Sequence, residues 1–355
     1  MAVEKGRGAT LNGESRRFNM PERHADGDWL DARSEIDGLP PRRRTEVTVE
    51  HPRSIISRNN SPDIAFSQSI NAYRGCEHGC IYCFARPTHA YHDLSPGLDF
   101  ETRLFAKPNA AELLRSELSK KSYSVAPLAM GTNTDPYQPI EKDWRITRQC
   151  LELLWECRHP TYVTTKSDRI LRDIDLLKAM AQEQLLSVMI SVTSLDPAVA
   201  RTLEPRASHP LRRLEAIRQL SQAGVPVVAS ISPVIPAITD HEIEAILARV
   251  AEAGAREASY IPVRLPHEVA PLFRDWLDAH YPDRAAKVMA IIQAIRGGRD
   301  NDSNFGSRMR GQGVWADLIR TRFLKARKRV GLGGERLTLR TDLFRPPQGP
   351  QLQLL

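Results

Sequence analysis

The chain has 355 residues, is 41% hydrophobic and carries a formal net charge of +7, with five cysteines. This length and apolar content allow a sizeable buried core, and the mild basic excess favours an anionic partner. No apolar run approaches the ~20 residues that span a bilayer, and no apolar signal segment is evident, so we expect a soluble, cytoplasmic protein with no membrane partner.

Residues 1–60 contain little apolar periodicity and much Arg, Asp, Glu, Gly and Pro. This composition favours an N-terminal arm that is partly flexible or that wraps around the rest of the chain. At the other end, 281–331 is rich in Lys and Arg and predicts a basic helical extension, with a helix over 314–330. Residues 332–355 are expected to form a flexible tail.

Between these segments, over 61–280, short apolar runs alternate with amphipathic segments of helical period. The predicted strands are 65–70, 126–131, 161–165, 186–192, 225–231 and 258–263, and the predicted helices are 110–118, 146–157, 169–182, 210–223, 241–253 and 267–280. Such alternation predicts right-handed crossovers and a parallel sheet. The fold class is therefore α/β, as a partial (β/α)6 TIM-like barrel, with its chemistry at the carboxyl ends of the strands.

The first of these strands runs into a loop in which Cys76, Cys80 and Cys83 follow the spacing C-x3-C-x2-C. The odd cysteine count argues against disulfides. A structural zinc site would need His78 or His89 as a fourth ligand, and no second cysteine pair follows. Cys150 and Cys157 fall on the apolar face of a predicted helix and are expected in the core. A [4Fe-4S] cluster held by three cysteines would instead leave one iron open.

The loop Arg74–Cys83, with an aromatic residue before its last cysteine, resembles the cluster loop of the radical S-adenosylmethionine (SAM) superfamily. Further segments resemble an uncharacterised bacterial group of the spore photoproduct lyase branch: 95–102, 131–141, 203–206 and 308–313. The resemblance implies a [4Fe-4S] cluster on the three cysteines and SAM on the open iron. It also implies cleavage of SAM to a 5'-deoxyadenosyl radical and a reducing partner such as flavodoxin or ferredoxin.

The resemblance, together with position at strand ends, also implies the cofactor contacts. We expect the residues that bind SAM to face one cavity beside the cluster; they are Tyr82, Asn133, Lys166, Ser191 and Arg206. For each of them an ordinary role in the barrel lining or in a loop stays open. The catalytic residue for the substrate is not identified by the sequence.

The substrate is the least determined part of the function. Spore photoproduct lyase returns a hydrogen atom from a cysteine, and the matching position here is Thr132, which argues against the same lesion chemistry. The segment 296–329 holds ten Arg or Lys residues against three Asp. It could bind nucleic-acid phosphates, or pack as a solvated helix over the barrel mouth. Modification of a peptide or small molecule, or a non-enzymatic metal-binding module, are the alternatives.

Overall fold

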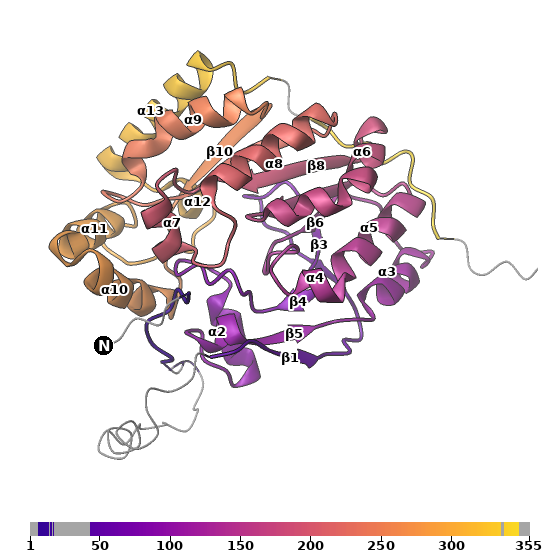
Figure 1. Ribbon diagram of the computed structural model, residues 1–355, viewed down its shortest axis with the longest axis horizontal. Coiled ribbons are helices and arrows are strands. Elements are labelled where there is room, and N and C mark those ends of the chain that lie inside the picture. The colour runs from indigo at the N-terminus through magenta and orange to yellow at the C-terminus, as the bar shows by residue number, and fades with distance from the viewer. Residues whose placement is uncertain (1–5, 14, 16, 18–42, 335–336, 348–355) are drawn as a thin grey trace, which may run out of the picture.

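A computed structural model describes residues 6–13, 15, 17, 43–334 and 337–347 (Figure 1). Its main sheet has seven strands in the order β10-β9-β8-β7-β6-β3-β2. Their bounds are β2 (Ile56–Arg58), β3 (Gln68–Ile70), β6 (Leu128–Met130), β7 (Thr161–Thr165), β8 (Leu186–Ser191), β9 (Val227–Val234) and β10 (Glu257–Pro262). The six predicted strands are confirmed, and all six run parallel.

Each of the six parallel strands pairs with the next one along the chain, which is the order of a singly wound barrel. β3 and β10 do not pair, so the barrel is open, as the sequence predicts. The edge beside β3 is covered by β2, which runs antiparallel to it. A second sheet, not predicted, has the order β1-β5-β4 and contains β1 (Glu46–Val49), β4 (Tyr73–Arg74) and β5 (Arg103–Ala106).

Amphipathic helices cover the outside of the barrel. They are α3 (Ala110–Leu118), α5 (Ile146–Glu156), α6 (Ile174–Gln182), α8 (Pro210–Gln222) and α9 (Ile243–Glu252). Their apolar faces join the strand residues in one buried core. The predicted helix 169–182 begins as a 3-10 segment, η2 (Asp168–Asp173), and the Ser167 hydroxyl at its start accepts a hydrogen bond from the backbone N–H of Arg169. Other short helices are η1 (Arg86–His92), α2 (Asp99–Thr102), α4 (Glu141–Trp144), α7 (Pro197–Leu203), η3 (Asp240–Glu242) and α12 (Ser307–Arg310).

The sequence predicts a barrel helix over 267–280 and a basic helix over 314–330 at the barrel mouth, and the structure exchanges these two positions. The basic helix α13 (Gly313–Arg329) packs along α9 and over β10, where the ring of Phe323 lies 4.6 Å from that of Tyr260. Ile319, Phe323 and Ala326 recur at helical spacing and enter the barrel core. α13 is thus a wall of the barrel (Figure 1), and the prediction that it packs over the mouth is wrong.

The predicted sixth barrel helix exists as α10 (Val269–His280), but it packs elsewhere. Together with α11 (Pro282–Ala294) it forms a second core with Ile81 and Leu203, at the carboxyl ends of the strands. The indole nitrogen of Trp276 donates to the carbonyl of Thr202 at 3.0 Å. The helical pair α10–α11 therefore packs against the cysteine loop at the barrel mouth, where the sequence predicts the basic segment.

The tail is packed where it is described. Over 337–347 the backbone N–H groups of Arg340 and Arg345 donate to the carbonyls of Gln184 and Cys157. Leu339 is buried, and the ring of Phe344 lies 5.4 Å from that of His159. This part of the predicted flexible tail is held against the amino-terminal end of the barrel. No helix in the described ranges is long and apolar enough to cross a bilayer.

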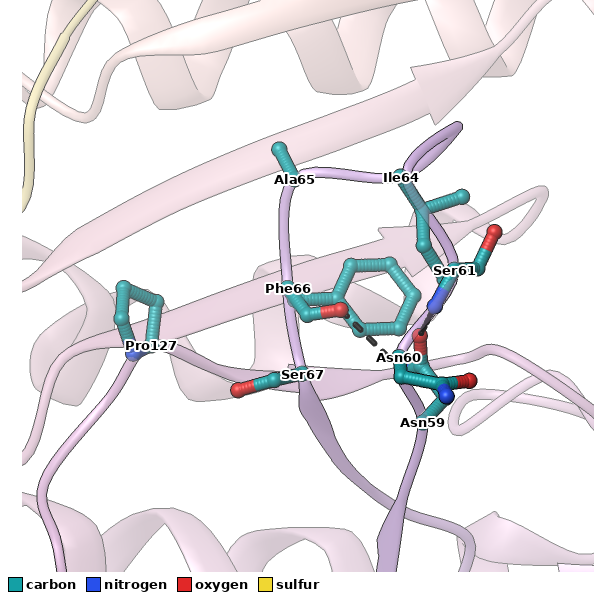
Figure 2. A pocket seen from close by; sticks show the side chains of 8 residues that line it. All are labelled: Asn59, Asn60, Ser61, Ile64, Ala65, Phe66, Ser67 and Pro127. Atoms are coloured by element: carbon teal, nitrogen blue, oxygen red, sulfur yellow. Dashed lines mark hydrogen bonds between the residues drawn. The ribbon is translucent and has the colours of Figure 1, made fainter. Parts of the chain in front are cut away.

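A surface hollow of about 440 Å³ lies beside the β2–β3 hairpin (Figure 2). Its lining comes from residues 59–61 and 64–67 and from Pro127. Within it the side-chain amide of Asn59 donates to the carbonyl of Phe66 at 3.1 Å. These residues precede β3 and β6, whereas the cysteine loop follows β3, so the hollow lies at the opposite end of these strands.

Candidate functional site

The cysteine loop begins just after β4 and turns at two glycines. Gly75 and Gly79 have φ values of +72° and +67°, which L side chains rarely adopt, and a Cβ on Gly75 would lie 2.6 Å from Leu104. Cys76 and Cys80 are buried, and Cys83 is half-buried. The local sequence thus fixes a compact loop that presents three thiols in a largely dry environment.

The three thiols lie close enough to influence one another. Burial, followed by the charges of Asp135 and Cys80, holds the pKa of the Cys76 thiol well above its ordinary value. The backbone N–H of Asp135 donates to this thiol and acts in the opposite direction. A group bound here would therefore meet a backbone donor at the Cys76 sulfur, which stabilises a charged sulfur.

The donor set was compared with the needs of a metal. No three His, Cys, Asp or Glu side chains in the described part of the chain are gathered as a single metal ion requires. A [4Fe-4S] cluster makes a different demand, because each cysteine binds a different iron. Three thiols on one compact loop, without a fourth cysteine beside them, fit such a cluster with one iron left open.

The turn after β6 holds the cysteine loop from one side. The carbonyl of Gly75 accepts hydrogen bonds from the Thr134 hydroxyl at 2.6 Å and from the Gln138 amide at 3.3 Å. The Gln138 carbonyl oxygen accepts from the backbone N–H of Glu77 at 2.9 Å. The sequence predicts a cofactor contact from this turn, and in the structure its side chains position the loop that carries the cysteines.

Asp135 connects this turn to β7. Its carboxylate accepts hydrogen bonds from the Thr165 hydroxyl at 2.6 Å and the Lys166 backbone at 2.8 Å, and Nδ1 of His78 lies 3.3 Å away. Burial alone would raise the pKa of Asp135, but His78 and these donors outweigh it and lower the pKa to about 2. Asp135 is therefore ionised at neutral pH and ties three segments of the site together.

A second buried carboxylate, Glu204, lies on the other side of the loop. It accepts a hydrogen bond from the Tyr82 phenol and one from the Thr193 hydroxyl at 2.7 Å, and it pairs with Arg213 at 2.5 Å. Burial would raise its pKa, but the charges of Arg213 and Lys166 outweigh burial and lower the pKa to about 2. The carboxylate is ionised, with both hydrogen bonds on Oε1 and the ion pair on Oε2.

Lys166 lies between this carboxylate and the cysteine loop. Its ammonium is 5.9 Å from the centre of the Tyr82 ring. Burial would lower the pKa of Lys166, but the charges of Cys80 and Glu204 outweigh burial and raise it. A permanent cation therefore lies beside Cys80, where it attracts negative charge on the sulfur or on a ligand.

The structure brings together three of the five predicted cofactor contacts. Tyr82 and Lys166 meet at Glu204, and the backbone carbonyl of buried Ser191 accepts from Arg213 at 3.2 Å. Arg206 lies in the segment after α7 and pairs with Glu77 of the cysteine loop at 3.0 Å, apart from these three residues. The backbone N–H of Asn133 donates to Asn71 at 2.9 Å, near the start of the loop.

Several residues that hold the site were not selected from the sequence. Glu204 belongs to the motif 203–206, in which the sequence predicts only Arg206 as a cofactor contact. Arg213 shares a helix face with buried Leu214, Ile217 and Leu220, and a charged residue on an apolar face is the signal that could have found it. Arg86 and Glu101 form a buried ion pair at 2.5 Å beneath the loop, and no local pattern distinguishes them.

The sequence was compared with known protein families. A family model described as the radical SAM superfamily matches residues 70–250, which is more than half of the chain. The chain belongs to the radical SAM superfamily. Members of this superfamily are enzymes that use a [4Fe-4S] cluster and SAM, and they generally need a reductant.

Similar proteins come from bacteria, archaea and a phage. An uncharacterised protein of Mycobacterium tuberculosis is 34% identical over 66% of this chain and 69% of its own length. One from Methanocaldococcus jannaschii is 28% identical over 60% of this chain and 76% of its own length. A radical SAM Nalpha-GlyT isomerase of Pseudomonas phage M6 is 26% identical over 64% of this chain and 46% of its own length.

Among solved structures, spore photoproduct lyase complexed with dinucleoside spore photoproduct has a similar fold. The TM-score is 0.58 at 14% sequence identity, over 81% of this chain and 80% of that one. This similarity of fold, together with the parallel sheet and the helical C-terminal part, confirms the expected fold class.

Proposed function

We propose that Cys76, Cys80 and Cys83 hold the [4Fe-4S] cluster and that the enzyme abstracts a hydrogen atom from an anionic substrate, a nucleic acid or a nucleotide. When bound, the cluster supplies the electron that cleaves SAM to methionine and a 5'-deoxyadenosyl radical. A flavodoxin or ferredoxin is the proposed electron donor. The three thiols, two of them buried, support this assignment.

The residues around Glu204 are proposed to form the cofactor side of the cavity. Lys166 and Arg213 carry positive charge next to Cys80, and both are partners of Glu204. Tyr82 is oriented by its bond to the same carboxylate. Ser191 remains a predicted contact on this side, and Asn133 and Arg206 on the flanks of the loop. Because the network is buried, it excludes water from the place where a radical would form.

One observation supports an anionic substrate: the environment of Arg264. This residue lies two positions after Pro262, the last residue of β10, and so at the carboxyl end of that strand. Its guanidinium donates to the sulfur of Met309 at 3.4 Å, and within the described ranges it has no ion pair within 4.0 Å. Its buried Nε has no hydrogen-bond acceptor. A buried cation whose one hydrogen bond in the described chain goes to a thioether can bind an anion.

The neighbours of Arg264 are themselves basic. Burial, followed by the charge of Arg308, lowers the pKa of Arg264. Arg296 nearby donates only to carbonyls, those of Pro262, Val263, Ser307 and Arg308. Two nearby carboxylates, Asp63 and Asp302, partly offset these charges. An anionic group at this rim would relieve repulsion among the arginines.

The basic extension contributes less to substrate binding than the sequence suggests. Arg308 pairs with Asp63 at 2.6 Å and donates to Ser61, and so anchors the β2–β3 hairpin. Arg322 pairs with Glu244 of α9 at 2.6 Å. Arg310 and Arg320, in the same basic segment, are exposed. We therefore propose Arg264 as the anion contact, in place of the arginines of the segment 296–329.

Two further points bear on the reaction. The structurally similar spore photoproduct lyase binds a dinucleoside, which favours nucleic-acid chemistry here. Thr132, however, donates and accepts hydrogen bonds with Asn71 and has no thiol to return a hydrogen atom. We therefore propose a reaction other than repair of the same lesion.

The test measures binding of a fluorescent dinucleotide and a short single-stranded DNA to anaerobically reconstituted enzyme at low and high salt. We expect affinity to fall with salt and Arg264→Gln to weaken binding about tenfold, as loss of a charge-assisted contact does. Lys325→Gln, an exposed cation on α13, is the matched control and should bind like the wild type. An affinity that changes neither with salt nor with the Arg264→Gln substitution would favour a peptide or a neutral small molecule as the substrate.

A further inference from the structure

The side of the cysteine loop opposite the barrel is held by one buried arginine. Arg86 is completely buried, and its guanidinium donates to the carbonyls of Cys80 at 2.9 Å and Gly79 at 3.1 Å. It also donates to the carbonyls of Pro96 and Gly97 at 3.0 and 2.9 Å. One side chain thus joins the backbone at the second cysteine of the loop to the backbone at Pro96 and Gly97.

The counter-ion of Arg86 is Glu101, which accepts hydrogen bonds from residues 7–9 of the N-terminal arm. The carboxylate pairs with Arg86 at 2.5 Å and accepts hydrogen bonds from the backbone N–H groups of Gly8 at 2.9 Å and Ala9 at 2.8 Å. The guanidinium of Arg7 donates to the Glu101 carbonyl at 3.0 Å. Residues 7–9 and the cysteine loop are therefore linked through a single buried ion pair.

The arm also touches the loop directly. A Cβ on Gly8 would lie 1.7 Å from the carbonyl oxygen of Gly79, so no residue larger than glycine fits there without moving the loop. Further along, the side chain of Asn12 exchanges two hydrogen bonds with Asp99, both 3.0 Å long. A Cβ on Gly97 would lie 2.2 Å from the carbonyl oxygen of Leu11.

We propose that residues 7–13 form a strap that keeps the cysteine loop closed around its cluster, with Arg86 and Glu101 as positioning residues. This inference rests on the proposed cluster ligands. Loss of the strap contacts would free the backbone of Gly79 and Cys80 and let solvent reach the cluster. The strap should therefore control how long the cluster is retained, not whether the chain folds.

The test compares wild-type protein and variants, each full-length and anaerobically reconstituted, in the rate at which they release iron to excess EDTA. The loss of cluster absorbance measures this rate. Gly8→Ala should release iron about tenfold faster, because an added methyl overpacks a close contact. Asn12→Ala, at an exposed position, should do so a few-fold faster without changing thermal unfolding of the cluster-free protein. Gly13→Ala is the matched control, because a Cβ there meets nothing within 4 Å.

The outcomes separate the two proposals. Faster release from Gly8→Ala and Asn12→Ala, with wild-type release from Gly13→Ala, supports the strap. Wild-type release from both strap variants overturns the strap alone. A wild-type protein that takes up no cluster overturns the ligand assignment and the strap together. If Gly8→Ala does not fold, Asn12→Ala decides the question by itself, since its side chain lies at the surface.

Discussion

Glu204 and Arg213 form an ion pair 2.5 Å long, with side chains that are 1% and 2% exposed. The pair connects the motif after α7 to the inner face of α8 and carries the Tyr82 phenol. Because two charges are buried together, removal of one leaves the other without compensation. This pair therefore makes the candidate cofactor side rigid and also makes it vulnerable to single substitutions.

Arg213→Ala should destabilise the cluster-free protein by ~3–5 kcal/mol, because Glu204 would stay buried without its partner. Denaturant unfolding of the anaerobically purified protein measures this change. Arg218→Ala is the matched control on the same helix, since Arg218 pairs with Glu215 at the exposed surface. Equal midpoints for the two variants would mean that the buried pair contributes nothing.

Alanine at Cys76, Cys80 or Cys83 should abolish cluster binding, whereas wild-type protein should hold about four irons per chain. Cys150→Ala is the control, because Cys150 is fully buried in the barrel core and lies on α5. Iron analysis and 5'-deoxyadenosine formation after reduction give the readout. A Cys80→Ala protein with unchanged iron content and SAM cleavage contradicts the proposed ligand set, and zinc in place of iron would favour a metal-binding module.

Arg206 and Glu77 should act as one unit. Their ion pair is 3.0 Å long, so Arg206→Ala and Glu77→Ala should weaken SAM binding to a similar extent. The double variant should be no worse than either single variant, since contacting residues are not additive. Equilibrium binding of SAM to the reconstituted enzyme measures this cycle. If only Arg206→Ala weakens binding, Arg206 contacts the cofactor directly, as the sequence predicts.

His159 should make stability depend on pH. Burial, opposed by a hydrogen bond to the Pro160 carbonyl, lowers its pKa from 6.5 to about 4. Between pH 6.5 and 4 the His159 imidazole is protonated in the unfolded chain but neutral in the folded chain. The free energy of unfolding therefore falls as the pH falls from 6.5 to 4. The loss should reach about 3 kcal/mol. His159→Gln should reduce this slope in denaturant unfolding, because burial also lowers the pKa of His89 to about 4 and its contribution stays. An unchanged slope would contradict the assignment.

The sequence by itself determined the local parts of this protein. The six strands follow from short apolar runs, and the helices follow from apolar residues at helical spacing, because both periods record which face is buried. The cysteine loop was equally predictable from the sequence, since its three thiols and two glycines lie within nine residues. These features need no knowledge of distant contacts.

Only the tertiary structure decided which surface each element covers and which charges meet. The periodicity of α10 and α13 shows that each buries one face, but it does not name the partner, so the two helices exchange the expected roles. Arg86 and Glu101 are both charged residues that composition alone places at the surface. They are buried because the arm brings the Gly8 and Ala9 amides to Glu101 from 93 and 92 residues away. Contacts over such separations depend on the whole folded chain, and no local pattern records them.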